Sequence, residues 1–167
     1  MYQIGEIFVY GSSGVCEIVD IKKADFGGSE KTYYILAPIY DKKETIFVPV
    51  DSEKLVSKMK ELLTPDDIIA LIKTMPHKES IWIENVNIRR EEYKKIIKNA
   101  DREELITLLK TLYERRNMLQ LAGKKLSVYD ERFLKQAQHI IHSEIALVLQ
   151  LPREEIPSYI EKTLSAA

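Results

Sequence analysis

The residues best suited to metal binding are few and poorly grouped along the chain. His139 and His142 lie three positions apart in a segment of helical spacing, and Glu144 follows two positions later. Zinc needs three or four ligands on converging faces, and only His77 could supply another imidazole. A small metal-dependent hydrolase built on the histidine pair is therefore the weaker hypothesis, and we expect no metal site.

The patterns typical of nucleophilic or nucleotide chemistry do not occur in this sequence. Cys16 is the only cysteine, which excludes an internal disulfide, and it has no evident base partner. No serine stands in a nucleophile-elbow motif. The pair Gly27-Gly28 lacks the Lys-Ser/Thr that follows the glycines of a phosphate-binding loop. We therefore expect no enzymatic activity and no cofactor.

One basic segment gives an electrostatic indication of nucleic-acid binding. The whole chain has a net charge of −1, but residues 86–125 carry eleven Lys or Arg against six acids. Trp82, the only tryptophan, lies just before this segment. A large apolar side chain beside basic residues can stack on bases or enter the minor groove. A solvated helix face and a tryptophan of the core or of a domain interface are the alternative interpretations.

Residues 1–60 have the composition of short strands joined by tight turns. They hold five of the six glycines, and their apolar residues come in short β-branched and aromatic runs. Glycine-rich or polar turns are expected at 11–14, 27–28 and 41–43. Four or five short strands of this kind predict a small twisted barrel. Strands are expected at 7–10, 15–23, 32–37 and 44–48.

Residues 61–167 have helical spacing instead. Thr64 is placed to cap a helix that starts at Pro65 and ends before Pro76. Asp101 and Ser127 are further capping residues, each with a carboxylate three positions later. These signals predict an all-α bundle of about five helices. The helices are expected from 65 to about 75 and at 88–99, 101–121, 127–149 and 157–165.

The fold class expected for the chain is therefore α+β, with a β domain at 1–60 and a helical domain at 61–167. The first residues lack the basic and then apolar layout of a signal peptide. No apolar run approaches the roughly 20 residues needed to cross a bilayer. We expect a cytoplasmic protein without membrane contact, and a monomer.

Several segments, taken in order, resemble the CarD family of bacterial transcription regulators. The opening residues 4–18 are similar to the family's "G-x-x-V-V-Y-x-x-x-G-V-x-x-I" start, which transcription-repair coupling factors share. Residues 44–50 resemble a family strand that ends in V-P. The resemblance continues through a central helix and loop and a long helix, matched by 105–113, 123–126, 130–137 and 144–149.

The resemblance implies a Tudor-like barrel that docks on the β subunit of RNA polymerase. It also implies a helical domain that contacts promoter DNA at the upstream edge of the transcription bubble. Family members tune the stability of the open promoter complex. Their docking strand is matched here by Thr45, Ile46, Phe47 and Val48. Their DNA contacts are a minor-groove tryptophan and nearby basic residues, which would correspond here to Trp82, Arg89, Arg90, Lys94, Lys124 and Lys125.

Two departures from the family pattern bear on these residues. Better-known members have paired arginines almost directly after the tryptophan, whereas six residues separate Trp82 from Arg89 here. Some members place an arginine where this chain has Phe47, so the polymerase contact is expected to be more apolar. An adaptor whose helical half binds a protein instead of DNA, with Trp82 as an interface anchor, is the alternative hypothesis.

Overall fold

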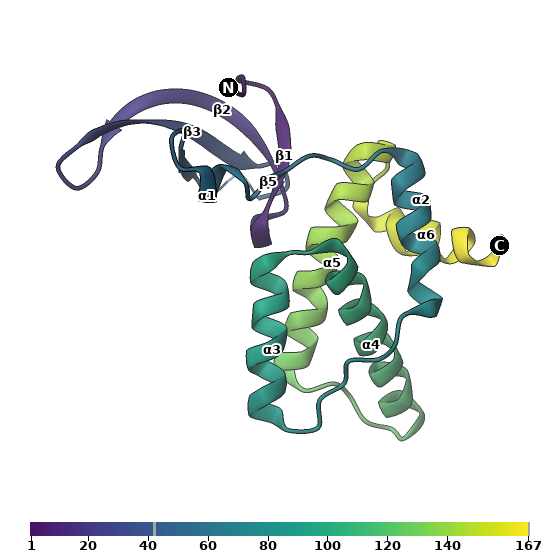
Figure 1. Cartoon of the computed structure of the whole chain (residues 1–167). Coiled ribbons are helices and arrows are strands. Elements are labelled where there is room, and N and C mark those ends of the chain that lie inside the picture. The colour runs from purple at the N-terminus through teal and green to yellow at the C-terminus, as the bar shows by residue number, and fades with distance from the viewer. Residues whose placement is uncertain (42, 167) are drawn as a thin grey trace. The chain divides into compact units, whose positions relative to one another are not determined.

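The computed structural model describes residues 1–41 and 43–166 and divides into two compact units (Figure 1). The first unit is Met1–Leu62 and the second is Leu63–Ala167. The sequence had placed the boundary between residues 60 and 61. The first unit is called the sheet unit below, and the second the helical unit.

The sheet unit is a five-stranded antiparallel sheet in the order β4-β3-β2-β1-β5. Neighbouring strands β2 and β3 form a long hairpin, whose register runs from Cys16 opposite Pro38 to Asp25 opposite Glu30. At its tip Gly27 and Gly28 have positive φ angles of 83° and 96°, which glycine adopts at no steric cost. The strands are β1 (Ile7–Tyr10), β2 (Val15–Asp25), β3 (Glu30–Pro38), β4 (Ile46–Pro49) and β5 (Met59–Lys60).

The predicted Tudor-like barrel is not closed in the described residues. The strands β4 and β5 are the two edges of the sheet, and they do not pair with each other. Between them lies the one-turn helix α1 (Glu53–Val56), and β5 pairs with β1 over only two residues. Closure needs continuous pairing around the whole sheet, so the result here is an open, curved sheet.

One face of the sheet carries an apolar core. Alternation along the strands directs Phe8, Cys16, Ile18, Leu36 and Val48 to this face, and all five side chains are buried. Burial raises the pKa of the Cys16 thiol to about 12, as expected of a packing residue and not of a reactive thiolate.

The helical unit begins its main helices where the sequence predicted. Thr64, Asp101 and Ser127 each accept a hydrogen bond from the backbone N–H three residues ahead. The described residues form six α-helices, one more than predicted, because α1 of the sheet unit was not predicted. The five that belong to the helical unit are α2 (Pro65–Thr74), α3 (Val86–Asn99), α4 (Arg102–Leu121), α5 (Val128–Leu149) and α6 (Ile156–Ser165).

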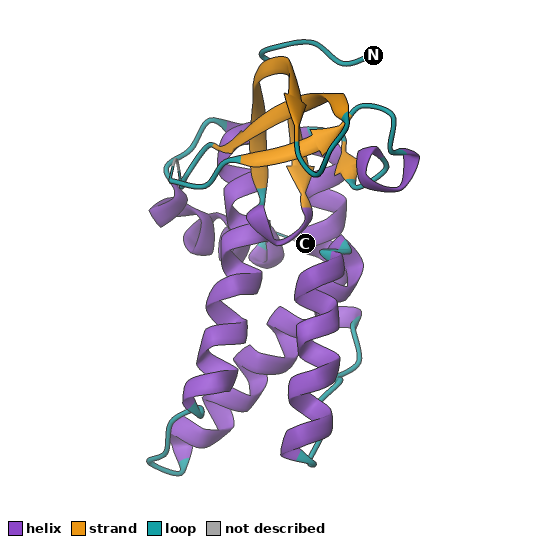
Figure 2. Ribbon diagram, turned by 90° about the vertical axis from the view of Figure 1, so that its left-hand side faces the viewer, coloured by secondary structure: helices purple, strands orange, loops and turns teal. Residues whose placement is uncertain are grey.

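The helices α3, α4 and α5 lie side by side in alternating directions (Figures 1 and 2). Leu105, Leu109, Leu134 and Ile141 are fully buried between them. Because of the alternation, α3 begins, α4 ends and α5 begins at the same end of the unit. No helix in the described part of the chain is both long and apolar enough to span a membrane.

Candidate nucleic-acid interface

The end of the helical unit where α3 begins holds a buried ion pair. Arg89 is only 6% exposed. Its Nε and one terminal nitrogen donate to the two carboxylate oxygens of Asp130, at 3.1 and 3.2 Å. Its other terminal nitrogen donates to the carbonyls of Ile83 and Glu84, at 2.8 and 3.4 Å. Arg89 therefore ties the start of α5 to the segment that precedes α3.

This burial changes the role predicted for Arg89. A phosphate contact needs N–H donors that face solvent, whereas all three guanidinium nitrogens of Arg89 are bonded inside the protein. The carboxylate that binds it comes from Asp130, which also accepts from the Ser127 hydroxyl at 3.0 Å. Arg89 is placed to hold the surface in shape and not to contact DNA.

Trp82 lies in the segment that Arg89 holds. The ring is half-buried, with the guanidinium carbons of Arg89 and Arg115 at 4.2 and 4.5 Å from its centre, within the range of cation–π attraction. Its indole N–H is enclosed and has no acceptor among the described residues. The neighbouring Ile81 is fixed on both sides, because its N–H donates to Thr111 and its carbonyl accepts from Tyr93.

Two further arginines at this end lie within cation–π distance of one exposed tyrosine. The guanidinium carbons of Arg90 and Arg132 lie 3.6 and 5.7 Å from the ring centre of Tyr129. A guanidinium that lies over a ring keeps its in-plane N–H groups available as donors. The Nε–H of Arg90 is enclosed and has no acceptor among the described residues, so an anion would be bound through the terminal nitrogens.

The loop between α4 and α5 adds two exposed lysines. Gly123 has a φ of 71° and ends α4, and Lys124 N–H then donates to the Leu119 carbonyl at 2.7 Å. The Lys124 and Lys125 side chains are exposed. The name basic end is used below for this surface, which comprises Trp82, Arg90, Arg115, Lys124, Lys125, Tyr129 and Arg132.

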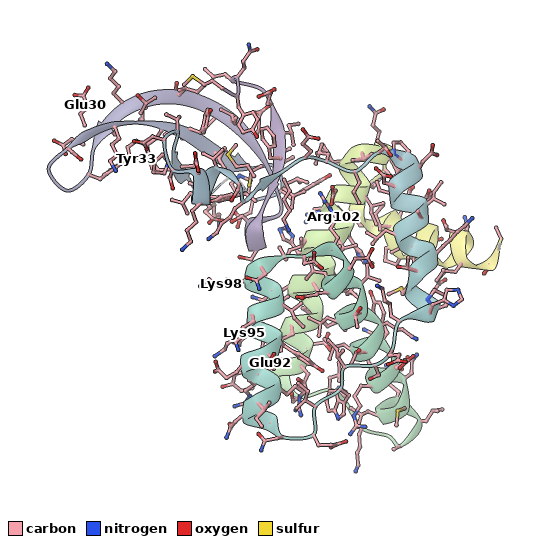
Figure 3. The ribbon with its side chains drawn as sticks, in the orientation of Figure 1. Glu30, Tyr33, Glu92, Lys95, Lys98 and Arg102 are labelled. Atoms are coloured by element: carbon pink, nitrogen blue, oxygen red, sulfur yellow. The ribbon has the colours of Figure 1, made fainter. Side chains whose placement is uncertain are left out.

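The basic end differs in charge from the rest of the unit. Residues 115–132 carry five basic and two acidic side chains, and one of those acids, Asp130, is neutralised by Arg89. Farther along α3, Lys94 pairs with Glu91 at 3.7 Å. Lys95 pairs with Glu92 at 3.3 Å, and Figure 3 labels these two residues on the same helix. Uncompensated positive charge is therefore concentrated at the basic end, while the predicted site residue Lys94 is exposed but paired.

The histidine pair shows no sign of a metal centre. Within residues 1–41 and 43–166 no three His, Cys, Asp or Glu side chains are grouped so that they could hold a metal. His142 is 8% exposed, and burial lowers its pKa to about 4. The adjacent Glu144 is bound instead by Arg102, through two contacts of 2.7 Å, and by the Leu63 N–H.

In the sheet unit, the predicted docking residues occupy different environments along an edge strand. Thr45 precedes β4 and is exposed, and Ile46 packs partly against the core. Phe47 is 38% exposed, and its ring meets Phe26 edge to face with centroids 5.2 Å apart. The Val48 side chain is fully buried, so it is not available to contact a partner.

Sequence reasoning missed part of the basic end. It named Trp82, Arg90, Lys124 and Lys125, which the structure brings to the same end of the unit. It did not name Arg115, Arg132 or Tyr129 as site residues, and it did not identify Asp130 as the partner of Arg89. The i,i+3 spacing of Tyr129 and Arg132 on a helix was a usable signal, whereas the contact of Arg115 with Trp82 spans 33 positions and has no local signal.

Two family matches cover nearly the whole chain. Residues 2–60 match the CarD-like/TRCF RID domain, the RNA polymerase-interacting domain, and residues 69–161 match the CarD C-terminal domain. The chain belongs to the CarD family. It is therefore an RNA polymerase-interacting transcription factor. No curated protein sequence is significantly similar to the chain.

Proposed function

We propose that this CarD-family protein docks on the β subunit of RNA polymerase through its sheet unit and contacts promoter DNA through the basic end, at the upstream edge of the transcription bubble. It thereby alters the stability of the open complex, and it needs no enzymatic activity to do so. The observation that carries the proposal is the gathering at one end of the helical unit of cations that form no ion pair among the described residues. Two of them, Arg90 and Arg132, lie near the Tyr129 ring.

In this proposal Arg90, Lys124 and Lys125 contact the phosphates, with Arg115 and Arg132 beside them. Lys94, which lies one turn along α3 from Arg90, contributes less because it is paired with Glu91. Phosphate contacts of this kind bind DNA without reading its sequence. Any promoter preference should then come from the ease with which the DNA is deformed.

Docking on polymerase allows the DNA affinity of the helical unit to be low. A tethered module acts at a high effective concentration next to one stretch of DNA. A net charge of −1 suits this arrangement, because a strongly basic protein would be titrated by nonspecific DNA.

The edge strand β4 supports the docking half of the proposal. It pairs with β3 on one side only, so the backbone groups of its other side can accept an additional strand. Phe47 projects from this strand where some relatives have an arginine. Its half-exposed ring, supported by Phe26, favours an apolar contact on the polymerase side.

The test is the lifetime of the open complex formed by polymerase, promoter and a triple variant Arg90→Glu/Lys124→Glu/Lys125→Glu. We expect the protein's effect on that lifetime to fall about tenfold, which corresponds to about 1.4 kcal/mol. The dependence of log affinity on log salt should also become shallower by roughly 2 to 3, because each lost phosphate contact removes about 0.9.

The matched control is Lys73→Glu/Lys98→Glu/Lys162→Glu, which makes the same charge change at exposed positions of the helical unit outside the basic end. If the basic-end variant binds polymerase normally and the lifetime does not change, the DNA role is wrong. The adaptor hypothesis, in which the helical unit binds a protein, would then be favoured.

A further inference from the structure

The exposed apolar residues of the helical unit are not scattered. All of its large hydrophobic side chains that are exposed, among the residues described, lie in the first turn of α3, the last turn of α4 or the first turn of α5. Single exposed hydrophobic residues are ordinary, but a group confined to one end of a domain marks an interaction site. The group comprises Val86, Ile88, Met118, Leu121, Val128 and Tyr129.

Helix folding does not require aliphatic residues at these positions. Val86 and Ile88 are the first and third residues of α3, and Val128 is the first residue of α5. Polar and acidic residues suit a first helical turn better than β-branched aliphatics do. These three side chains are 44%, 54% and 72% exposed, so they contribute little to the core.

Trp82 is less accessible than these aliphatic side chains. The ring lies against the guanidinium groups of Arg89 and Arg115, and its N–H is enclosed. Insertion of the indole into DNA would break both stacking contacts and the packing around Arg89. Val86, Ile88 and Val128 could enter a partner without any such rearrangement.

A shallow groove continues the surface beside Val128. It has a volume of about 330 Å³ and is lined by Leu126, Val128, Glu131, Arg132 and Lys135. Its apolar part is aliphatic, and two of its three charged side chains are basic. An apolar surface bordered by cations is complementary to a nucleic-acid strand, whose sugars and base edges are apolar and whose phosphates are anionic.

We infer that Val86, Ile88 and Val128 form the apolar contact with opened promoter DNA, and that Trp82 is a positioning residue which holds Arg89 and Arg115. The inference rests on the proposed function. In a closed duplex the bases are stacked, so the aliphatic side chains gain contact mainly where a step has opened. They therefore favour the open over the closed complex by differential contact.

The test uses the full chain with polymerase and promoter and compares Ile88→Ser/Val128→Ser with Ile88→Val/Val128→Ile. The serine variant should lose the effect on open-complex lifetime about tenfold, with closed-complex affinity and salt dependence unchanged, because no phosphate contact is removed. The aliphatic variant should retain the effect. Circular dichroism checks that both variants fold, and serine is well tolerated at helix starts.

Trp82 variants complete the experiment. Trp82→Phe keeps an aromatic ring next to Arg89 and Arg115, so its effect on open-complex lifetime should stay within about twofold of that of the natural protein. Trp82→Ala should lose this effect and should also alter the salt dependence of DNA affinity. An equal loss in Trp82→Phe and Ile88→Ser/Val128→Ser would overturn the inference and favour the indole. If the Arg90/Lys124/Lys125 variant loses the effect on open-complex lifetime but the serine variant keeps it, the inference fails while the proposed function stands. If both variants keep the full effect on lifetime, the proposed function fails and the inference fails with it.

Discussion

The two units differ in what their interiors contain. The buried side chains found in the described part of the sheet unit belong to hydrophobic residues. Its core cluster includes Phe8, Ile18 and Leu36. Every buried polar or charged residue found over 1–41 and 43–166 lies in the helical unit. These residues are Arg89, Thr111, Asp130, His142, Ser143 and Glu144.

This difference in interior composition follows from the groups that form each candidate interface. The edge of a sheet displays backbone groups whose positions are set by strand register, so β4 needs no oriented side chains beneath it. The basic end is made of side chains from three helices and from the segments next to them, and helix ends need contacts that fix them in place. Arg89–Asp130 does this at the basic end, and Arg102–Glu144 does it near the start of α4.

Buried ion pairs are an expensive way to obtain stability. Desolvation of two charges offsets much of their attraction, and well-packed apolar residues are often at least as stabilising. Both pairs here are two-pronged, with two nitrogens on two oxygens. Such geometry constrains orientation as well as distance. We therefore interpret the pairs as devices that specify the arrangement of the helix ends.

The largest effect should come from breaking the pair under the basic end. Asp130→Ala leaves the Arg89 charge buried without a partner, so the free energy of unfolding of the helical unit should fall by about 3–5 kcal/mol. Urea unfolding followed by Trp82 fluorescence measures it. The control Glu131→Ala removes a neighbouring carboxylate that forms no ion pair in the described structure, and should cost less than about 1 kcal/mol. Equal losses would contradict the interpretation.

A core substitution in the sheet unit creates a cavity and leaves no buried charge without a partner. Leu36 is fully buried, so Leu36→Ala should destabilise this unit by about 3 kcal/mol. Amide hydrogen exchange should show faster opening in peptides from residues 1–62 and unchanged protection in α4 and α5. Val19→Ala, at a 44% exposed position of β2, is the control. Loss of protection in both units would show that their interiors are coupled.

A pH titration should affect the helical unit more than the sheet unit. Burial lowers the pKa of His142 from its ordinary value of 6.5 to about 4. Below pH 6.5 the unfolded chain therefore binds a proton that the folded protein does not. The free energy of unfolding then decreases as the pH is lowered. The loss between pH 6.5 and 5 should be about 2 kcal/mol, at about 1.4 kcal/mol per unit.

The variant His142→Leu removes this titrating group. Its unfolding free energy, measured by urea at pH 7 and pH 5, should be about 2 kcal/mol less sensitive to pH than that of the natural protein. An unchanged pH dependence would mean that other groups account for it.

The smallest effect is expected at a helix start. Thr64 and Asp67 form a reciprocal capping box in which each side chain accepts from the other's backbone N–H. Thr64→Ala should lower the free energy of unfolding of the helical unit by about 1 kcal/mol. Ser158→Ala, at an exposed position of α6, provides a control with no cap to lose. A cost above about 3 kcal/mol would show that Thr64 does more than cap a helix.

The sequence alone determined the fold class, most element boundaries and the family. Strand 7–10 was predicted with the bounds that it has, and the caps Thr64, Asp101 and Ser127 are confirmed. These features depend on contacts within about three residues, which a sequence displays directly. By contrast, α1 and β5 were missed because four and two residues carry too little pattern.

The tertiary structure decided which predicted site residues face outward. Arg89 and Arg90 are adjacent and chemically identical, yet one is bonded to Asp130, 41 positions away, and the other stacks on Tyr129 at the surface. The same packing half-buries Trp82 and leaves Ile88 exposed. The environment of a charge or ring depends on what the fold brings near it, and that proximity has no local signature in the sequence.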